Sequence, residues 1–220
     1  SSVIADSTIA MQEKLNNNEI SKRQFIEYLD TVHKSSLLIS NNLKRASNLI
    51  SDFKQTAVIQ NEDDKCEFEL TAFIKETISV LNPDELASNI SVSVHCANDI
   101  YVYQDKEVLK QVVNNLFNNS VAHAFPDGRH GEIAIAFIDE GERVKIKYQD
   151  NGVGIKAEHL AHIFEPFYTT KRGQGGTGLG MHIVYNLVTQ SLEGSIECKS
   201  DGELGATFEI CMKKSLDHSD

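Results

Sequence analysis

The chain has 220 residues, of which 40% are hydrophobic and 24% are charged, and its formal net charge is −11. This length suits one medium-sized domain or two small ones. The negative charge argues against unspecific binding to nucleic acid or anionic lipid, since both need a positive surface field. No apolar run approaches the roughly 18 residues of a membrane helix. We therefore expect a cytoplasmic fragment without membrane contact of its own, with any anchor of the parent protein outside it.

The cysteines give no sign of a metal or disulfide framework. They are far apart in the sequence and form no Cys-x-x-Cys pair. This spacing favours core residues in a reducing compartment over a zinc site. The four are Cys66, Cys96, Cys198 and Cys211.

Residues 1–60 contain neither proline nor glycine, which favours long helices. We predict two helices that are separated near residues 15–19, the second spanning about 20–57. Ser21 and Gln24 have the spacing of a capping box at its start. Apolar residues then recur at alternating intervals of four and three, a heptad pattern that calls for a partner helix. The seam comprises Phe25, Leu29, Val32, Ser36, Ile39, Leu43, Ala46, Ile50 and Phe53.

Two arrangements satisfy such a seam. One is a helical hairpin within a single chain. The other, which the helix length favours, is a homodimer in which two hairpins form a four-helix bundle. A charged linker at 60–65 then separates a helical region, 1–60, from a second domain, 61–220.

Residues 61–220 alternate between strand and helix patterns. This alternation, with antiparallel strands at the end, predicts an α+β fold in which helices cover one face of a sheet. We expect strands at 66–70, 90–95, 100–103, 132–138, 143–148, 195–199 and 207–212, and helices at 71–81, 106–125 and 177–192.

Seven of the thirteen glycines fall between positions 152 and 180. Because each glycine makes a segment costlier to order, such a density indicates a loop that closes around a ligand or lets backbone approach it. A flexible surface loop is the simpler alternative. The run leads into the predicted helix at 177–192, whose free amides would form a phosphate seat. Lys171 and Arg172 stand just before it and would neutralise phosphate charge.

The segment 173–178 also matches the Gly-x-Gly-x-x-Gly fingerprint of dinucleotide-binding folds, and Asp201 follows at a compatible distance. That fingerprint must follow a buried strand. The preceding residues, 165–172, do not have a strand pattern, so we reject this reading.

Four asparagines lie within six positions of the predicted helix 106–125. Asparagine is a mediocre helix former, so propensity does not explain them. An amide oxygen is a hard, neutral ligand that suits Mg²⁺. The residues form two i, i+4 pairs, and spacing does not decide which pair faces a site: Asn114 with Asn118, or Asn115 with Asn119.

Taken in order, four motifs resemble the N, G1, F and G2 boxes of sensor histidine kinases, whose ATP-binding domain has the Bergerat fold. Thr207 resembles a late threonine of that family, and the N-terminal helices resemble its dimerisation and phosphotransfer region. The motifs are Asn115-x-x-x-Asn119-Ser-x-x-His123, Asp150-Asn-Gly152-Val-Gly154, Phe164-Glu-Pro-Phe167 and Gly176-Thr177-Gly178-Leu179-Gly180.

The resemblance implies a role for each motif. Asn119 would hold Mg²⁺ with help from Asn115, and His123 would lie near the phosphates. Asp150 would accept a hydrogen bond from the adenine amino group, with Gly152 and Gly154 letting the base lie close. Residues 155–176 would form a lid, closed by a latch of Phe164 and Phe167. The triphosphate would be bound by Lys171, Arg172, Gly176, Thr177, Gly178, Leu179 and Gly180, with Thr207 also at the nucleotide.

Less specific explanations exist for some of these residues. Asp150 can cap a helix, and the two phenylalanines can be core residues. His159 and His162 are spaced like metal ligands, but no third histidine or cysteine is near them in the sequence. We therefore interpret this pair as part of the lid surface.

The resemblance also predicts the reaction. Related ATPases place a glutamate, the general base for water, where this chain has Asn115, and an amide cannot take a proton. We therefore expect transfer of the γ-phosphoryl group from Mg-ATP to a histidine, with relay to the receiver domain of a response regulator. A GHKL-type ATPase and a non-catalytic nucleotide-sensing scaffold are the alternatives.

The phosphoacceptor itself departs from the family pattern. The family has it in a His-Glu pair, and none of the eight histidines here precedes a glutamate. We expect the acceptor just upstream of this fragment, which would then bind ATP or ADP without phosphorylating itself.

Overall fold

The computed structural model describes residues 2–17, 20–56, 64–81, 89–126, 129–171 and 176–214. The chain divides into two compact units, residues 1–51 and 52–220, and each is described by itself. The boundary predicted at residue 60 lies outside the described residues and stays a prediction.

The N-terminal part is helical, as predicted. Helix α1 spans Ser2–Asn16 and helix α2 spans Lys22–Thr56. The capping box is confirmed: the backbone amide of Gln24 donates to Oγ of Ser21 (3.2 Å), and the amide of Ser21 donates to Oε1 of Gln24 (3.1 Å). These bonds satisfy free amides at the start of α2. Oγ1 of Thr8 and the Tyr28 hydroxyl lie 2.9 Å apart and link the two helices.

The apolar seam of α2 is largely exposed in the single chain. Leu29 is 49% exposed and Leu43 is 66% exposed, and Phe25 and Ile39 are exposed as well. The side chains of Ile50 and Phe53 lie outside the described part of the chain. A helical hairpin and a dimeric bundle both stay predictions. Among the described residues, no helix is long and apolar enough to cross a bilayer.

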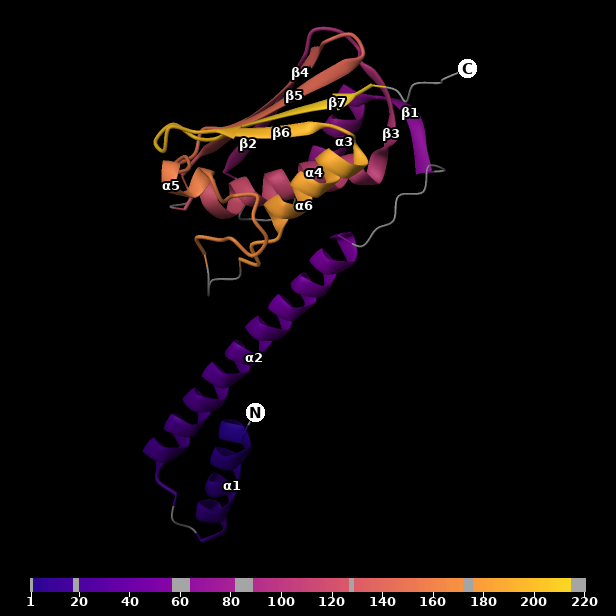
Figure 1. The fold of residues 1–220 in the computed structure, drawn as a ribbon. Helices are drawn as coiled ribbons and strands as arrows, with labels where there is room; N and C mark the ends of the chain where they lie inside the picture. The colour runs from indigo at the N-terminus through magenta and orange to yellow at the C-terminus, as the bar shows by residue number, and fades with distance from the viewer. Residues whose placement is uncertain are drawn as a thin grey trace. The chain divides into compact units, whose positions relative to one another are not determined.

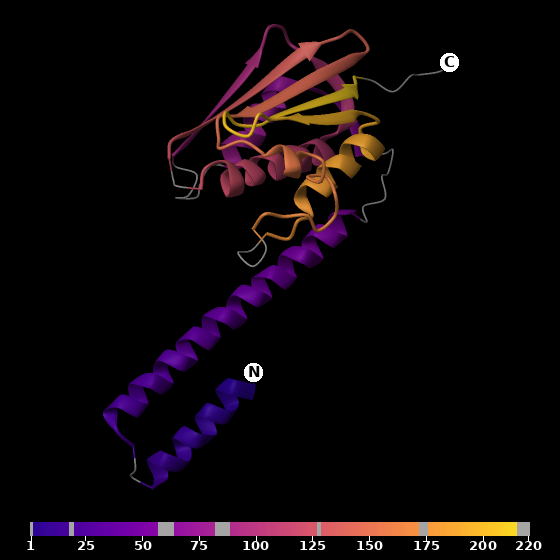
Figure 2. The ribbon, with the colours of Figure 1, turned by 60° about the vertical axis from the view of Figure 1, so that its left-hand side comes forward.

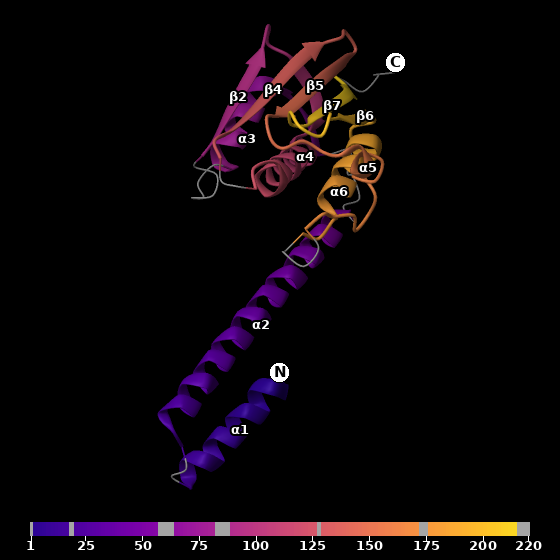
Figure 3. The same ribbon diagram turned by 90° about the vertical axis from the view of Figure 1, so that its left-hand side faces the viewer.

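The second unit is built on a five-stranded mixed sheet with the order β2-β4-β5-β7-β6 (Figure 1, Figure 3). Strand β2 pairs with β4 in parallel, and the other three pairings are antiparallel. The strands are β2 Ile90–Cys96, β4 Gly131–Asp139, β5 Arg143–Asp150, β6 Ser195–Lys199 and β7 Thr207–Lys213. Two further strands, β1 Lys65–Glu69 and β3 Tyr101–Asp105, form a separate antiparallel pair.

Three helices cover one face of the sheet (Figure 1, Figure 2). They are α3 Leu70–Leu81, α4 Lys106–Asn119 and α6 Gly180–Asn186, and a short helix, α5 Ala157–Leu160, lies in the segment 155–176 that is predicted to form a lid. Alternate residues of β4, β5 and β7 are buried against these helices, including Ile135, Ile146 and Ile210. The predicted α+β sandwich is therefore confirmed.

Two helices differ from their predicted forms. The predicted helix 106–125 is α-helical to Asn119 and then widens into a π-helix, η2, at Ser120–Ala124. The predicted helix 177–192 begins at Gly180 and ends in a second π-helix, η3, at Leu187–Ser191. Residues 177–179 therefore precede the helix, because Gly178 has a positive φ of 71° that no α-helical turn contains.

Candidate nucleotide site

Asp150 ends strand β5 and is 3% exposed. Its Oδ1 accepts hydrogen bonds from the backbone amides of Gly152 (2.9 Å) and Ala206 (3.2 Å). Its Oδ2 accepts one from the hydroxyl of Ser120 (3.2 Å). Burial raises the pKa of the Asp150 carboxyl, whereas these three donors act in the opposite direction. The two backbone donors lie outside helices and the third donor is a side-chain hydroxyl. These partners therefore do not support the alternative that Asp150 serves as a helix cap.

The two glycines that follow Asp150 lie against protein backbone. A Cβ on Gly152 would lie 2.7 Å from the carbonyl oxygen of Ala124. Gly154 has a φ of 74°, and a Cβ there would lie 2.9 Å from the amide nitrogen of Glu203. Both positions therefore require glycine for packing within the protein. Their close approach to a base stays a prediction.

The turn between β6 and β7 closes against this end of the site. The Ser200 hydroxyl donates to the carbonyl of Gly205 (2.6 Å) and accepts from the amide of Ile155 (2.8 Å), where the lid begins. A Cβ on Gly205 would lie 2.8 Å from the carbonyl carbon of Asp150. Thr207 is the first residue of β7, partly buried, and pairs with Gln149 in the sheet. The late Gly-Ala-Thr segment is thus packed onto the strand that ends in Asp150.

Helix α4 brings one of the asparagines to the second glycine motif. The Asn115 side chain donates through Nδ2 to the carbonyl of Gln111 (2.9 Å). Its Oδ1 lies 3.2 Å from the position of a Cβ on Gly180. Asn119 is the last residue of α4 and is partly buried, whereas Asn118 is exposed. The spacing of the asparagines did not decide which pair faces the site. In the structure, Asn115 lies beside Gly180, so the N and G2 motifs meet through Asn115.

The π-helix η2 carries His123 to the lid. Nδ1 of His123 lies 3.3 Å from Oγ1 of Thr170, and the Lys171 ammonium group donates to the carbonyl of Ala122. Burial, and then the nearby charge of Lys171, lower the pKa of His123. The imidazole is therefore kept neutral more readily than in water. Arg172 lies outside the described residues, so its predicted role is untested.

The two phenylalanines of the F motif have different surroundings. Phe164 packs against the core; its carbonyl accepts from Nδ1 of His182 (3.0 Å), and its ring lies 5.6 Å from the ring of Tyr185. Phe167 is 60% exposed and has a φ of 65°, which is rare outside glycine. Phe164 is therefore anchored to α6, while a latch that includes Phe167 stays a prediction.

The G2 motif packs against the F motif. A Cβ on Gly178 would lie 2.8 Å from the carbonyl oxygen of Phe167, and one on Gly176 would lie 2.6 Å from Oγ1 of Thr169. Oγ1 of Thr177 accepts from the amide of Leu179 (3.3 Å), and Leu179 itself is buried. Since α6 begins only at Gly180, the predicted phosphate seat would consist of this turn and not of a helix start at Thr177.

The histidine pair of the lid has ordinary polar partners. Nδ1 of His159 lies 2.7 Å from the Tyr168 hydroxyl, and Nδ1 of His162 lies 2.8 Å from Oε1 of Glu165. Within the described ranges, no group of three or more histidine, cysteine, aspartate or glutamate side chains could hold a metal ion. These contacts support the interpretation of the pair as lid surface.

Several contacting residues were not singled out from the sequence: Ser120, Ser200, Thr170 and His182. Ser120 directly follows Asn119, and Tyr148 lies two positions before Asp150 on the same face of a strand. Ser120 thus adjoins the N motif and Tyr148 adjoins the G1 motif, but the link between them spans 28 positions and is not predicted by spacing. The contacts of Ser200 and His182 are long-range and leave no such local signal.

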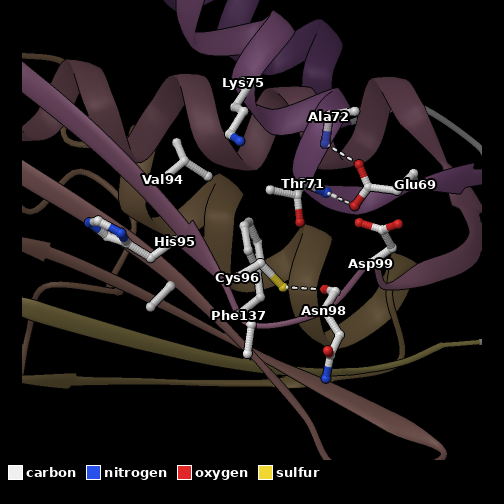
Figure 4. Close-up of a pocket in the computed structure, with 12 residues that line it drawn as sticks. Glu69, Thr71, Ala72, Lys75, Val94, His95, Cys96, Asn98, Asp99 and Phe137 are labelled. Carbon is white, nitrogen blue, oxygen red and sulfur yellow. Dashed lines mark hydrogen bonds between the residues drawn. The ribbon is translucent and has the colours of Figure 1, made fainter.

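A cavity of about 630 Å³ lies elsewhere in this unit, between α3, β2 and β4 (Figure 4). It shares no residue with the predicted nucleotide site. Its lining includes Glu69, Thr71, Lys75, His95, Asp99 and Phe137.

Comparisons with known proteins point to the same assignment as the motifs. Residues 104–216 match the family described as histidine kinase-, DNA gyrase B- and HSP90-like ATPases. Sporulation kinase B of Bacillus subtilis is 32% identical over 181 residues, which cover 82% of this chain and 41% of that protein. The chain spans less than half the length of the curated relatives that it matches.

Solved structures agree with this family. The catalytic domain of histidine kinase ThkA is 30% identical, with a TM-score of 0.60 over 69% of this chain and 96% of that one. A structure of ThkA in complex with the response regulator protein TrrA is 23% identical, with a TM-score of 0.65 over 97% of this chain and 62% of that one. The second likeness is one of fold alone. The chain therefore belongs to the histidine kinase-, DNA gyrase B- and HSP90-like ATPase family and contains an ATP-binding catalytic domain of the type found in sensor histidine kinases.

Proposed function

We propose that this chain binds Mg-ATP between α4, the end of β5 and the segment 151–180, and transfers the γ-phosphoryl group to a histidine for relay to a response-regulator aspartate. The observation that carries the proposal is the buried Asp150 carboxylate. It is aligned by three donors and coupled through Ser120 to the asparagine helix. A buried carboxylate at a strand end is suited to accept a hydrogen bond from the adenine amino group.

The residues at the other end fit a magnesium triphosphate. Asn115 keeps Oδ1 unused by its own helix, because only Nδ2 donates to Gln111. Asn119 would supply the protein ligand to Mg²⁺, with Asn115 beside it, and the remaining positions would be filled by phosphate oxygens and water. Lys171 and Arg172 would face the phosphates, with His123 alongside. The bound metal would neutralise charge that develops on the transferring phosphoryl group.

Residues of the glycine motifs would line the nucleotide. Gly152 and Gly154 would border the base, and Thr207 would lie behind it. Phe164 and Phe167 would close the lid over the nucleotide. The phosphates would contact the turn formed by Gly176, Thr177, Gly178, Leu179 and Gly180.

Transfer to a histidine fits the residue at position 115 better than hydrolysis does. An amide cannot accept a proton near neutral pH, so Asn115 would not activate water. An imidazole is itself a nucleophile and needs no base at that place. Rate enhancement would come from positioning and charge stabilisation.

The N-terminal helices belong to the same proposal. An exposed apolar stripe on α2, with Leu29 and Leu43 about half exposed or more, favours a homodimer through residues 1–60, followed by the catalytic domain 61–220. The response-regulator receiver would be the second partner, as the ThkA–TrrA complex illustrates for a protein of the same fold. A cytoplasmic location fits the need for ATP.

Calorimetry with Mg-ATP and Mg-ADP tests the nucleotide site directly. Binding that requires magnesium supports the proposal, and no binding in folded protein overturns it. Labelled ATP is then supplied with the histidine-containing helical domain of a related sensor kinase. We expect acid-labile label on that domain and none on this chain. Binding without transfer would favour a nucleotide-sensing scaffold, and phosphate release without an acceptor would favour an ATPase.

A further inference from the structure

A chain of three buried polar groups crosses from strand β5 to the end of the asparagine helix. Tyr148 and Ser120 are each 1% exposed, and both lie beside Asp150. The Tyr148 hydroxyl donates to Oγ of Ser120 (3.1 Å), and Ser120 donates to Oδ2 of Asp150 (3.2 Å). Unlike Asp150, neither hydroxyl residue is proposed above to contact the nucleotide.

The direction of these hydrogen bonds is fixed by the tyrosine. Burial raises the pKa of Tyr148, so its hydroxyl keeps its proton and remains a donor. A serine hydroxyl carries a single proton. Because Ser120 accepts a hydrogen bond from Tyr148, the hydroxyl proton of Ser120 can point toward Oδ2 of Asp150 and form the second hydrogen bond. Tyr148 therefore sets Ser120 as a donor toward the carboxylate.

The other oxygen of Asp150 is occupied by donors as well. Oδ1 accepts from the amides of Gly152 and Ala206. In this network, the three groups that contact the Asp150 carboxyl group therefore all donate hydrogen bonds to it. Donors stabilise the ionised form, which burial alone would disfavour. An ionised carboxylate accepts hydrogen bonds and donates none.

Ser120 lies at the start of the π-helical turn η2, directly after the asparagine helix. Ser120 and Ala124 are the two buried residues of η2, and both face the segment that begins at Asp150. The Ala124 carbonyl accepts from the amide of Val153 (3.0 Å). The wider π turn therefore fastens the end of the asparagine helix to both ends of the Asp150–Val153 segment, a placement that is frequent at functional sites.

We propose that Ser120 and Tyr148 are positioning residues that hold Asp150 as an acceptor only, so that the pocket selects 6-amino purine nucleotides over 6-oxo purine nucleotides. The inference rests on the nucleotide site proposed above. Adenine presents an amino donor at position 6, whereas guanine and hypoxanthine present a carbonyl acceptor. An ionised Asp150 pairs with the first and repels the second. A protonated Asp150 would donate to the carbonyl instead.

The test compares adenosine diphosphate with inosine diphosphate, which carries an oxo group at position 6, both with magnesium. The variants are Ser120→Ala and Tyr148→Phe. Thr77→Val is the matched control, since Thr77 is also buried and its hydroxyl donates within α3, to the carbonyl of Phe73 (2.9 Å). Kd is measured by calorimetry, and thermal melting reports folding of each variant.

We expect the wild-type chain and Thr77→Val to prefer the adenosine nucleotide by the same factor. In Ser120→Ala this preference should fall about tenfold, the effect of one hydrogen bond to a charged group. Tyr148→Phe should lower it less, because Ser120 keeps its hydroxyl but is free to turn away. It also serves as the second variant if Ser120→Ala does not fold.

Each other result overturns one claim. A wild-type chain that binds no adenosine nucleotide overturns the proposed site, whatever the variants do. A wild-type chain that binds it, with unchanged preference in both variants, overturns the inference alone. So does an equal loss of affinity for both nucleotides, because a merely structural role would weaken binding without changing the preference.

Discussion

The two ends of the proposed nucleotide site are built differently. At the base end, Asp150 is almost fully buried and accepts three hydrogen bonds, and the neighbouring glycines touch backbone. At the phosphate end, His123 and Lys171 are partly exposed, and two polar contacts join the facing segments: His123 with Thr170, and Lys171 with the carbonyl of Ala122. One end is fixed by the fold before a ligand arrives, whereas the other is held by a few polar contacts.

This difference indicates which property each end controls. A preformed, buried acceptor gives specificity without a cost of reorganisation on binding. A partly exposed lysine on the predicted lid can adjust as the nucleotide binds and as product leaves. Substitution of Asp150 at the base end should therefore lower nucleotide affinity most, and substitution of Asn115 at the phosphate end should lower turnover.

Asp150→Asn should have the largest effect. The amide presents donors where the adenine amino group also donates, so affinity for Mg-ATP should fall by about 10- to 100-fold, the range for a hydrogen bond to a charged group. Calorimetry measures the change, and thermal melting serves as the folding control. Unchanged affinity would mean that Asp150 does not contact the base.

Gly178→Ala should destabilise the fold more than Gly141→Ala. Both glycines have positive φ values, 71° and 86°, so alanine costs roughly 1–2 kcal/mol at either position. At Gly178 the added Cβ would also meet the Phe167 backbone, whereas at Gly141 it would meet nothing within 4 Å. Urea unfolding of the two variants measures the difference. Equal free energies of unfolding would show that the F and G2 motifs do not pack in solution as they do here.

Asn115→Ala should reduce phosphoryl transfer to the supplied acceptor by about tenfold, the low end of the range for one lost hydrogen bond to a charged group. Asn118→Ala is the matched control, because Asn118 forms the other asparagine pair with Asn114 and its side chain is exposed. Its transfer rate should equal that of the wild type. A larger loss in Asn118→Ala would assign the site to the other asparagine pair.

His123→Gln should produce the smallest effect, a change in pH dependence. The pKa of His123 is lowered in the folded state, so acidification through the ordinary value of 6.5 protonates the unfolded chain first. The unfolded state then binds more protons, and the free energy of unfolding falls as the pH falls. His123→Gln should weaken this dependence in urea unfolding at several pH values. Identical slopes would indicate that His123 is as solvated in the folded chain as in the unfolded one.

Local signals in the sequence predicted much of the fold. The Ser21–Gln24 capping box and the strand predicted at 143–148 depend on neighbouring residues, and both are found as expected. Asp105, about which no prediction was made, is a further local feature, since it ends β3 and accepts from the amide of Glu107 at the start of α4. Such features need no knowledge of distant contacts.

The remaining features depend on residues far apart in the sequence. The approach of Gly180 to Asn115 and of Gly205 to Asp150 arises only when helices and strands pack. The contacts of Ser120, at the start of the π-helix η2, with Asp150 and Tyr148 are likewise between residues far apart in the sequence. Family resemblance identified the motifs, but it did not identify the hydroxyl groups between them.

The parallel pairing of β2 with β4 has a consequence for how the chain folds. Antiparallel neighbours can meet through a short turn, whereas β2 and β4 are separated along the chain by β3, α4 and η2. Closing so long a connection loses chain entropy before any strand contact compensates, which slows the step. The asparagine helix lies within this connection, so nucleotide affinity should be acquired late during refolding. The rate at which binding returns after dilution from denaturant would then report completion of the sheet.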